Sequence, residues 1–403
     1  MSKSMKKISV DVAKNYRDII LALGAESAGN FSVFYSGKTY TSKNFGDLLN
    51  ENNFANFQQA IFNFLKDKNL KPNIILTDLH PEMKTTLWGK SLAKKFKAKH
   101  IQVQHHYAHI FSQIGGLNSC VSFSSGDAYG VALDGTGYGI DKKIWGGECF
   151  FISKKTGIER IGHLEYQTMI GGDLAIREPA RMLISVLPKI ETSNDDFGKN
   201  LTFRFVKKYY SKNEFQLLYN QMQQNFNCQK TSSAGRILDA VSVLLGFAEN
   251  ERKYKHQATK LLEQNSTKPY LDLKPDISLM SEDSKKYVLN TTRLFKYLIK
   301  NFHRDKRRLS ATAQLYIAQG FYEIIKKHSF KNKNKLTNNI ILSGGISDNK
   351  IISNYFISQK KLQNKKPFIA RGDNGLSFGQ ILFYISKNNL HLNNPSHLAN
   401  PWN

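Results

Sequence analysis

Short apolar runs that end in glycine-bearing turns recur along the chain and predict an α/β protein. Residues 19–34 (IILALGAESAGNFSVF) and 129–152 (YGVALDGTGYGIDKKIWGGECFFI) each read as an apolar strand, a turn with glycine and a second strand. Residues 339–345 (NIILSGG) and 367–385 place a strand and a glycine turn before a helix. This repetition indicates an internal duplication, and therefore two α/β lobes with a cleft between them.

Other segments extend this pattern on both sides of the second repeat. Large apolar side chains recur at helical spacing in residues 54–67 (FANFQQAIFNFLKD), whereas residues 73–78 and 101–104 read as buried strands. Residues 177–308 are mostly helical by pattern and predict a helical insertion in the second lobe. We expect the N-terminal lobe to span residues 1–118 and the C-terminal lobe residues 119–403.

Composition and charge fit a globular enzyme. Hydrophobic residues make up 40% of the 403 positions, which is too apolar for a disordered chain. Because single cores rarely grow beyond about 250–300 residues, this length accommodates two lobes. The 58 Lys and Arg against 32 Asp and Glu give a net charge of +26, which is compatible with an anionic partner. No aromatic platform interleaves with the basic runs, so we do not expect a nucleic-acid site.

The cysteines and the apolar runs bear on the compartment. Cys120, Cys149 and Cys228 lie far apart and form no CxxC pair, so neither a disulfide framework nor a thiolate zinc site is expected. The first residues are basic without an apolar run of signal length, and no stretch of about 18 apolar residues occurs. We therefore expect a cytoplasmic protein with no membrane span.

The sequence HHYAH places His105 and His109 four residues apart, directly after a predicted strand. On a helix, both imidazoles project from one face, which is the spacing that a single metal ion requires. Capping, surface or core histidines can share this spacing. Their position after a strand favours the ligand role, since side chains at strand ends point into clefts.

Two aspartates sit in glycine-containing turns. Asp134 ends the strand YGVALD and precedes Gly135 and Gly137, while Asp373 in RGDNG precedes the last predicted helix. A carboxylate followed by glycines can hold a cation while the backbone amides approach an anion. Either aspartate can also simply cap its own turn. Together with the two histidines they would form a mixed nitrogen and oxygen site suited to divalent iron or zinc.

Three glycine turns follow apolar strands and are typical of loops that cradle phosphate. They lie at Gly24, at residues 135–139, and at Gly344 and Gly345. The P-loop consensus is absent, and each turn alone can be an ordinary one. On a duplicated α/β framework the three together predict a nucleotide bound between the lobes.

Residues 170–183 (IGGDLAIREPARML) gather charged side chains next to a glycine pair. At helical spacing Arg177 and Arg181 share one face, and their guanidinium groups could bind phosphate or a planar carbamoyl group with two hydrogen bonds each. The alternative is a ladder of ion pairs with Asp173 and Glu178.

Residues 231–246 (TSSAGRILDAVSVLLG) begin with hydroxyl side chains and include Arg236 and Asp239. This pattern predicts a capped helix. The helix can serve the site through its arginine, or it can be an ordinary core helix.

Nine motifs, taken in order, resemble the C-terminal transferase region of the HypF family of hydrogenase-maturation carbamoyltransferases. They are LGAE, DLHPEM, VQHHYAH, ALDGTGYG, IWGGE, GGDLAIREPARM, TSSAGRILDAV, LSGGISDN and RGDNGLSFGQ, within residues 18–385. The resemblance implies an ASKHA-type fold with two ribonuclease-H-like lobes. Antibiotic O-carbamoyltransferases and tRNA threonylcarbamoyladenosine transferases share that fold.

The resemblance also implies the roles of individual residues. The metal ligands would be His105, His109, Asp134 and Asp373. The nucleotide would be bound near Gly24, Gly135, Thr136, Gly137, Ser232, Ser233, Gly344, Gly345 and Asn349. The catalytic side chains would be Asp173, Arg177, Arg181 and Arg236.

The implied reaction transfers a carbamoyl group from carbamoyl-adenylate, which derives from ATP, to an acceptor and releases AMP. Metal and arginines would polarise the carbonyl group and stabilise the developing negative charge. In the family pathway the acceptor is a C-terminal cysteine thiol of a partner, HypE, and the thiocarbamate is later converted toward the cyanide ligands of nickel–iron hydrogenase. We therefore expect a HypE-like partner.

The sequence departs from the family in ways that bear on its substrates. The acylphosphatase-like, paired zinc-finger and YrdC-like adenylating regions are absent from it, so we expect a separate YrdC-like protein to supply carbamoyl-adenylate. The Lys-Asn pair that usually follows GAE-Leu is replaced in GAESAGNF. A segment that usually reads YEGQA becomes YKHQA, with Lys255 and His256.

Three other functions fit parts of the pattern. One is O-carbamoylation of a small molecule or sugar, and another is threonylcarbamoyl transfer to tRNA. The third is a regulator that binds an adenylate without turnover.

Overall fold

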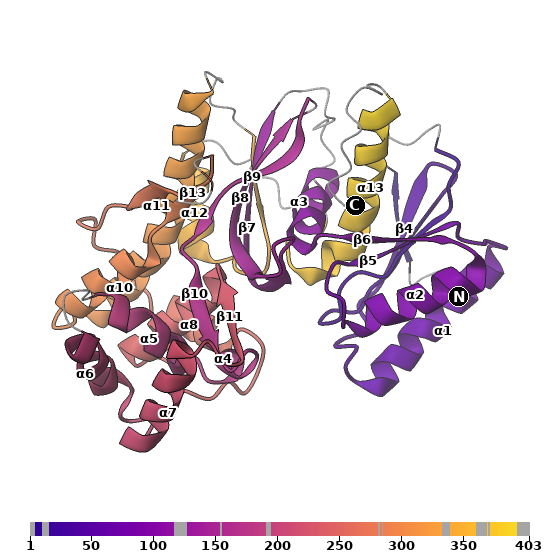
Figure 1. Ribbon diagram of the computed structural model, residues 1–403. Coiled ribbons are helices and arrows are strands. Elements are labelled where there is room, and N and C mark those ends of the chain that lie inside the picture. Colours follow the sequence, from indigo (N-terminus) through magenta and orange to yellow (C-terminus); the bar gives the residue numbers. More distant parts are fainter. Residues whose placement is uncertain are drawn as a thin grey trace.

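Two sheets, each with helices on both faces, form the framework of the computed structural model (Figure 1). The structure describes residues 5–9, 16–116, 127–153, 155–190, 195–280, 283, 285–332, 339–359, 369 and 371–392. Cys120 and most of the strand predicted at the start of residues 367–385 lie outside these ranges. The predicted α/β class is confirmed.

The first sheet lies in the N-terminal part of the chain. Its strands follow the order β1 (Met5–Ser9), β4 (Lys38–Ser42), β3 (Ser32–Tyr35), β2 (Ile20–Ala22), β5 (Ile74–Asp78) and β6 (Lys99–Val103). Strands β2, β5 and β6 are parallel, and the other pairs are antiparallel. Parallel strands end at the same edge of a sheet, and at this edge β5 ends at Asp78 and β6 leads into the HHYAH motif.

Helices cover both faces of this first sheet. Because neighbouring strand side chains point to opposite faces, Leu21 packs with α1 (Glu51–Asp67) and α2 (Lys84–Phe96). Ile20 and Phe34 instead pack against Ile381 of α13 (Leu376–Leu392).

Helix α1 forms for local reasons that the sequence contains. Asn50 caps it by accepting hydrogen bonds from the amides of Asn52 and Asn53. Phe57, Ile61 and Leu65 then form the buried stripe that faces the sheet.

The second sheet has eight strands. Six follow the order β10 (Gln167–Ile170), β11 (Cys228–Thr231), β8 (Ile144–Ser153), β9 (Gly157–Leu164), β13 (Tyr287–Leu289) and β12 (Ile277–Leu279). The long strand β7 (Ala128–Tyr138) pairs antiparallel with β8 and parallel with β14 (Ile340–Ser343). The parallel register brings the glycine turn after β14 beside the turn that contains Asp134.

Side chains of β7 alternate between two cores. Val131 and Leu133 pack with α8 (Ala234–Leu245) and α11 (Lys306–Lys331) in the largest core. Ala132 packs on the other face with Ile110 of α3 (His105–Gly116).

Most other helices belong to the segment predicted as an insertion, residues 177–308. They are α5 (Ala180–Val186), η4 (Leu187–Ile190), α6 (Asp195–Val206), α7 (Lys212–Gln223), α9 (Gln257–Gln264) and α10 (Thr291–Lys300), and α4 (Leu174–Arg177) ends where the segment begins. Nearer the C-terminus lie α12 (Lys350–Ser358) and the short 3-10 helix η5 (Asp373–Gly375). No helix within the described ranges is both long and apolar enough to cross a membrane.

Helices α3 and α13 pack against each other between the two sheets (Figure 1). A Cβ atom on Gly379 of α13 would lie 1.8 Å from the carbonyl oxygen of Ala108 in α3, so glycine allows the two backbones to approach. Helix α3 contacts the second sheet and α13 the first. Along the chain, the expected boundary at residue 118 separates the strands of the first sheet from those of the second. Each of these two helices, however, packs against the sheet on the other side of that boundary.

Candidate metal centre

The four predicted ligands come from the start of an α-helix, from a strand and from the start of a 3-10 helix, and they lie close together. His105 begins α3, His109 follows one turn later, Asp134 lies in β7 and Asp373 begins η5. Nε2 of His109 lies 3.3 Å from Oδ2 of Asp134 and 3.4 Å from Oδ1 of Asp373. Nε2 of His105 lies 3.3 Å from the same Asp134 oxygen, and one donor atom of each residue lies within 4.8 Å of all the others.

These spacings fit a divalent metal ion. Nitrogen and oxygen ligands bound tetrahedrally at about 2.0–2.2 Å lie roughly 3.3–3.6 Å apart. Neither ring nitrogen of His109, which is 0% exposed, has a hydrogen-bond partner of normal geometry within the described part of the chain. A buried polar atom left without a partner is unfavourable, and a metal would satisfy it. The donor set suits iron or zinc.

Charge complementarity already holds the cluster together. Burial acts to lower the pKa of His105, but the carboxylates of Asp78, Asp134 and Asp373 outweigh it and raise that pKa well above its ordinary value. Burial likewise acts to raise the pKa of Asp134, whereas the two neighbouring histidines hold that pKa well below its ordinary range. Asp134 and Asp373, whose pKa is also lowered, are therefore ionised, as metal ligands must be.

Asp78 contacts the cluster, and sequence reasoning quoted it in a motif without assigning a role. It ends β5, is 0% exposed, and accepts a hydrogen bond of 2.6 Å from Nδ1 of His105. Its other oxygen accepts from the amide of His80 at 3.0 Å. A carboxylate on the far nitrogen orients a metal-binding histidine, so Asp78 directs Nε2 of His105 into the cluster. An acid at the end of a buried strand was the available signal.

The predicted glycine turns pack directly on this cluster. A Cβ atom on Gly137 would lie 2.4 Å from the ring of His106 and 2.9 Å from that of His105. Gly344 has φ +86°, and its Cβ atom would lie 2.2 Å from the carbonyl oxygen of Leu133. The next amide, of Gly345, points to Oδ1 of Asp134 at 3.4 Å. These glycines let backbone approach the ligands where a side chain would not fit.

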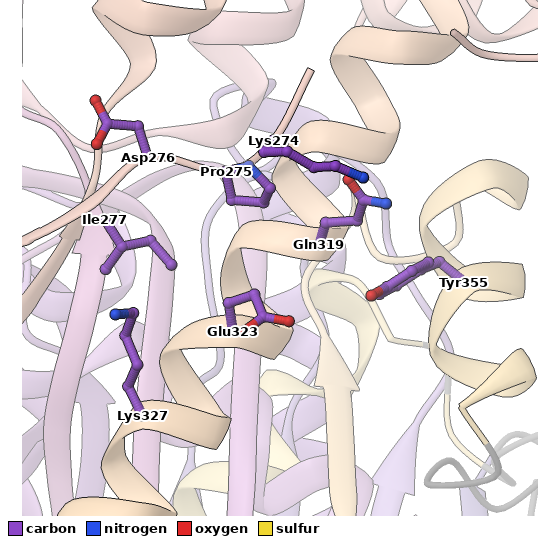
Figure 2. Close-up of a pocket in the computed structure, with 8 residues that line it drawn as sticks. All are labelled: Lys274, Pro275, Asp276, Ile277, Gln319, Glu323, Lys327 and Tyr355. Carbon is purple, nitrogen blue, oxygen red and sulfur yellow. The ribbon is translucent and has the colours of Figure 1, made fainter. Parts of the chain in front are cut away.

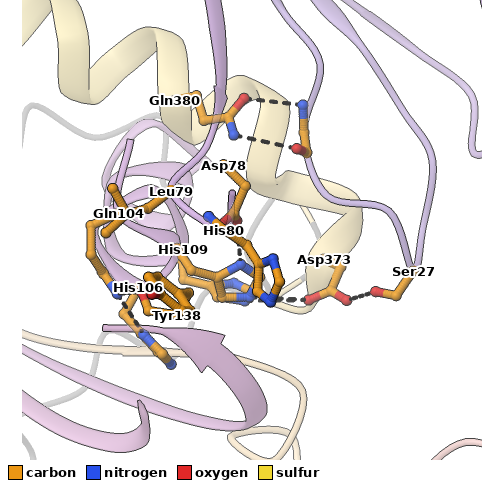
Figure 3. Close-up of polar contacts among 12 residues, drawn as sticks. Ser27, Asp78, Leu79, His80, Gln104, His106, His109, Tyr138, Asp373 and Gln380 are labelled. Carbon is orange, nitrogen blue, oxygen red and sulfur yellow. Dashed lines mark hydrogen bonds and ion pairs between the residues drawn. The ribbon is translucent and has the colours of Figure 1, made fainter. Parts of the chain in front are cut away.

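Gly24 connects the first glycine turn to α13. Its φ is +63°, and its amide donates to Oε1 of Gln380 at 3.0 Å, while the Gln380 side chain reaches back to its carbonyl oxygen (Figure 3). The turn is therefore fixed to the helix that follows Asp373.

Arg236 lies on α8 beside the turn that follows Asp134. Its side chain is 3% exposed, and Nη2 forms an ion pair of 3.0 Å with Asp239. Nη2 also lies 3.4 Å from the position of a Cβ atom on Gly135. Its Nε and Nη1 have no hydrogen-bond partner among the described residues. A buried guanidinium with unused donors is suited to bind an anion.

Ser232 and Ser233 hold the start of α8 against the same turn. The hydroxyl of Ser233 lies 2.6 Å from the carbonyl oxygen of Gly135 and caps the helix at the amide of Arg236. Ser232 donates to Glu148 at 2.5 Å. Glu148, from the IWGGE motif, is fully buried and also accepts from Nε of Arg160. Its structural role was missed, since an acid after two glycines also reads as a turn.

The other predicted catalytic residues make different contacts. Nε of Arg181 pairs with Glu178 at 2.9 Å, which matches the ion-pair alternative. Asp173 and Arg177 are exposed, and the carbonyl oxygen of Arg177 accepts from the amide of Arg252. Their catalytic role stays a prediction.

Two predicted nucleotide neighbours also differ in setting. Thr136 is exposed within the turn after Asp134. Asn349 caps α12 through Oδ1 and donates to Gln314 at 2.5 Å through Nδ2. The amide of Asn349 is therefore engaged within the fold.

A separate hollow of about 440 Å³ lies beside α11 and α12 (Figure 2). Its lining is Lys274, Pro275, Asp276, Ile277, Gln319, Glu323, Lys327 and Tyr355. None of these residues belongs to the predicted site, and acidic and basic side chains alternate around it. The hollow offers no constellation comparable with the histidine and aspartate cluster.

Two family models match the chain. Residues 130–380 match "Carbamoyltransferase, Kae1-like Domain, second subdomain", and residues 15–115 match "HypF Kae1-like domain". The probable carbamoyltransferase HypF of Methanocaldococcus jannaschii is 37% identical over 395 residues, which is 95% of this chain and 48% of the relative. Carbamoyltransferase HypF of Synechocystis is 30% identical over 73% of this chain and 38% of its own length. The chain thus spans about half or less of these curated relatives.

Solved structures agree with these matches. The crystal structure of T. kodakarensis HypF superposes with a TM-score of 0.81 at 29% identity, covering 95% of this chain and 49% of that one. A full-length HypF in a phosphate- and nucleotide-bound form gives a TM-score of 0.80 at 26% identity, covering 94% and 57%. The ASKHA-type fold predicted above is confirmed, and the chain belongs to the HypF carbamoyltransferase family.

Proposed function

We propose that the chain transfers a carbamoyl group from carbamoyl-adenylate to the C-terminal cysteine thiol of a HypE-like protein in hydrogenase maturation. One observation carries the proposal. The cluster of His105, His109, Asp134 and Asp373 adjoins the buried Arg236, whose Nε and Nη1 have no partner among the described residues. A metal site beside an anion-binding guanidinium suits a substrate that combines a carbonyl group with a phosphate.

The four ligands would hold a divalent iron or zinc ion, which acts as a Lewis acid on a bound carbonyl oxygen. Arg236 would bind the phosphate through its free edge, held in place by Asp239. The turn at Gly135 lies beside Arg236 and would contact the same anion. Ser233 keeps the Gly135 turn against the start of α8.

The proposed step balances without a redox partner. The acceptor sulfur forms a bond to the carbamoyl carbon, and the bond from that carbon to the phosphate oxygen breaks. AMP leaves with the electron pair of that bond, and the thiol proton passes to solvent. A free thiol acceptor requires the reducing conditions of the cytoplasm.

The names of the relatives support the transfer of a carbamoyl group, and the nucleotide-bound HypF structure supports an adenylate as its carrier. These names belong to proteins about twice as long as this chain or longer. The experiment therefore includes conditions with and without a YrdC-like protein, which is the proposed supplier of carbamoyl-adenylate.

The test combines the chain with carbamoyl phosphate, ATP and a peptide that ends in the cysteine of a HypE-like protein, with and without a YrdC-like protein. We expect AMP release and a peptide that gains the mass of one carbamoyl group. A peptide with serine in place of cysteine is the control and should stay unmodified. Modification of small alcohols but not of the thiol would replace this proposal by O-carbamoylation.

A further inference from the structure

Side chains from two distant segments of the chain meet at one oxygen atom. The loop GAESAGNF contains Ser27, and the segment YKHQA contains Lys255. These residues lie 228 positions apart, yet Nζ of Lys255 lies 3.1 Å from Oγ of Ser27. Both contact Oδ2 of Asp373, the predicted metal ligand that begins η5.

The two oxygens of Asp373 have separate partners. Oδ1 faces the histidines, at 3.4 Å from Nε2 of His109 and 3.8 Å from that of His105. Oδ2 accepts hydrogen bonds from the hydroxyl of Ser27 and, at 3.0 Å, from the ammonium group of Lys255. Figure 3 shows Ser27 pointing at Asp373 from the side opposite His109.

This arrangement restricts the rotation of the carboxylate. The Asp373 side chain is only 11% exposed, and turning it would leave Oδ2 without its two donors. Ser27 lies between β2 and β3 of the first sheet, while Lys255 lies between α8 and α9 beside the second sheet. The contacts that orient Asp373 therefore come from both halves of the molecule.

We propose that Ser27 and Lys255 are positioning residues that bind Oδ2 of Asp373 and so present Oδ1 to the metal. The inference rests on the metal centre of the proposed function. It assigns a role to two residues for which the sequence pattern gave none. It also makes completion of the ligand set depend on the apposition of the two sheets.

The positive charge of Lys255 and its proposed positioning role have opposite effects on the affinity for a metal ion. A lysine near a metal repels it, so removal of the charge alone would strengthen cation binding. Weaker metal binding after substitution of Lys255 can therefore come only from lost positioning. Ser27 is uncharged, and its substitution tests positioning without changing the charge near the metal.

The experiment titrates the metal-free chain with Co²⁺ and records both the dissociation constant and the visible absorption spectrum. We expect Ser27→Ala to raise the dissociation constant about tenfold and to alter the spectrum. Ser91→Ala, the same substitution on the exposed face of α2, should match the wild type. Thermal unfolding of the metal-free variants should be unchanged, since Ser27 is exposed.

A second pair of variants removes one positive charge each from the same loop. Lys255→Gln should bind Co²⁺ at least about threefold more weakly than Lys253→Gln, which alters an exposed neighbour. Wild-type affinity and spectrum in Ser27→Ala would overturn the positioning role and leave the metal centre intact. A wild type that binds no Co²⁺ would instead refute the metal centre of the proposed function, and the positioning role with it.

Discussion

Oδ2 of Asp78 lies 2.6 Å from Nδ1 of His105, and both side chains are buried. The pair fixes which ring nitrogen of His105 faces the other ligands, since Nε2 then points to Asp134 at 3.3 Å. The carboxylate that orients His105 thus comes from the end of β5, and this predicted ligand from the start of α3.

Asp78→Asn should weaken metal binding by about 10–100-fold, because the amide supports the histidine less strongly than a carboxylate does. Isothermal titration of the metal-free protein with Zn²⁺ measures the effect. Asp67→Asn, at an exposed position of α1, serves as the control and should bind like the wild type. Equal affinities in the two variants would show that Asp78 has only a structural role.

Loss of both histidines should remove the metal entirely. Elemental analysis of the wild type is expected to give one iron or zinc per chain, and the double variant His105→Ala/His109→Ala none. The double variant should also lose transfer activity. Full activity in a metal-free wild type would rule out these four residues as a catalytic metal site.

Arg236→Lys should keep the positive charge that balances Asp239 but lose the planar guanidinium group and its several N–H donors. We expect the affinity for AMP to fall about 10–100-fold, which corresponds to the loss of one charge-assisted hydrogen bond. Calorimetric titration with AMP measures this fall, and a thermal unfolding curve checks that the fold persists. Arg293→Lys, an exposed arginine on α10, is the matched control.

Gly344→Ala should lower the free energy of unfolding by at least about 2 kcal/mol. Two effects add, because alanine is strained at φ +86° and its Cβ atom would lie 2.2 Å from the Leu133 carbonyl oxygen. Gly157 also has positive φ, at +76°, but a Cβ atom there meets nothing within 4 Å. Gly157→Ala should therefore lose only about 1 kcal/mol in urea denaturation. Equal losses would mean that the clash at Leu133 relaxes.

His163 should make stability depend on pH. Burial and the nearby charge of Arg160 lower the pKa of His163 from 6.5 to about 3. Below pH 6.5 the unfolded chain binds a proton that the folded chain excludes. The free energy of unfolding therefore decreases as the pH is lowered. Between pH 6.5 and 5.5 the fall from this residue is about 1 kcal/mol.

The comparison variant is His163→Asn, whose amide can donate to the Leu164 carbonyl oxygen as Nδ1 of His163 does at 2.7 Å. Urea denaturation at several pH values should show a shallower fall for the variant. Parallel curves for the two proteins would mean that His163 is protonated in the folded state.

The convergence of the four predicted ligands was predictable because each of them carries a local signal. His105 and His109 share a helix face, and Asp134 and Asp373 each lie in a glycine-containing turn. Collinear motifs then joined four separate signals into one site. The strands and helices followed in the same way from hydrophobic periodicity, since that pattern reports which face of each element is buried.

Contacts between distant segments were not predictable from single positions. Ser27 and Lys255 carry no local signal for their contact, which exists only because two sheets approach each other. Arg181 did carry a local signal, but the signal was ambiguous. Its helical spacing suits ligand binding and equally suits the ion pair with Glu178. Local pattern alone could not decide between these uses, because both place the arginine on the same helix face.

The crossing of α3 and α13 sets an order in which the chain can acquire its structure during synthesis. One face of the first sheet is completed by Leu376, Ile381 and Ile385, which emerge from the ribosome long after β6 has been made. At about 5–20 residues per second, translation of residues 104–392 takes roughly 15–60 s. During this interval these residues cannot yet cover that sheet face, so the nascent N-terminal half exposes apolar surface.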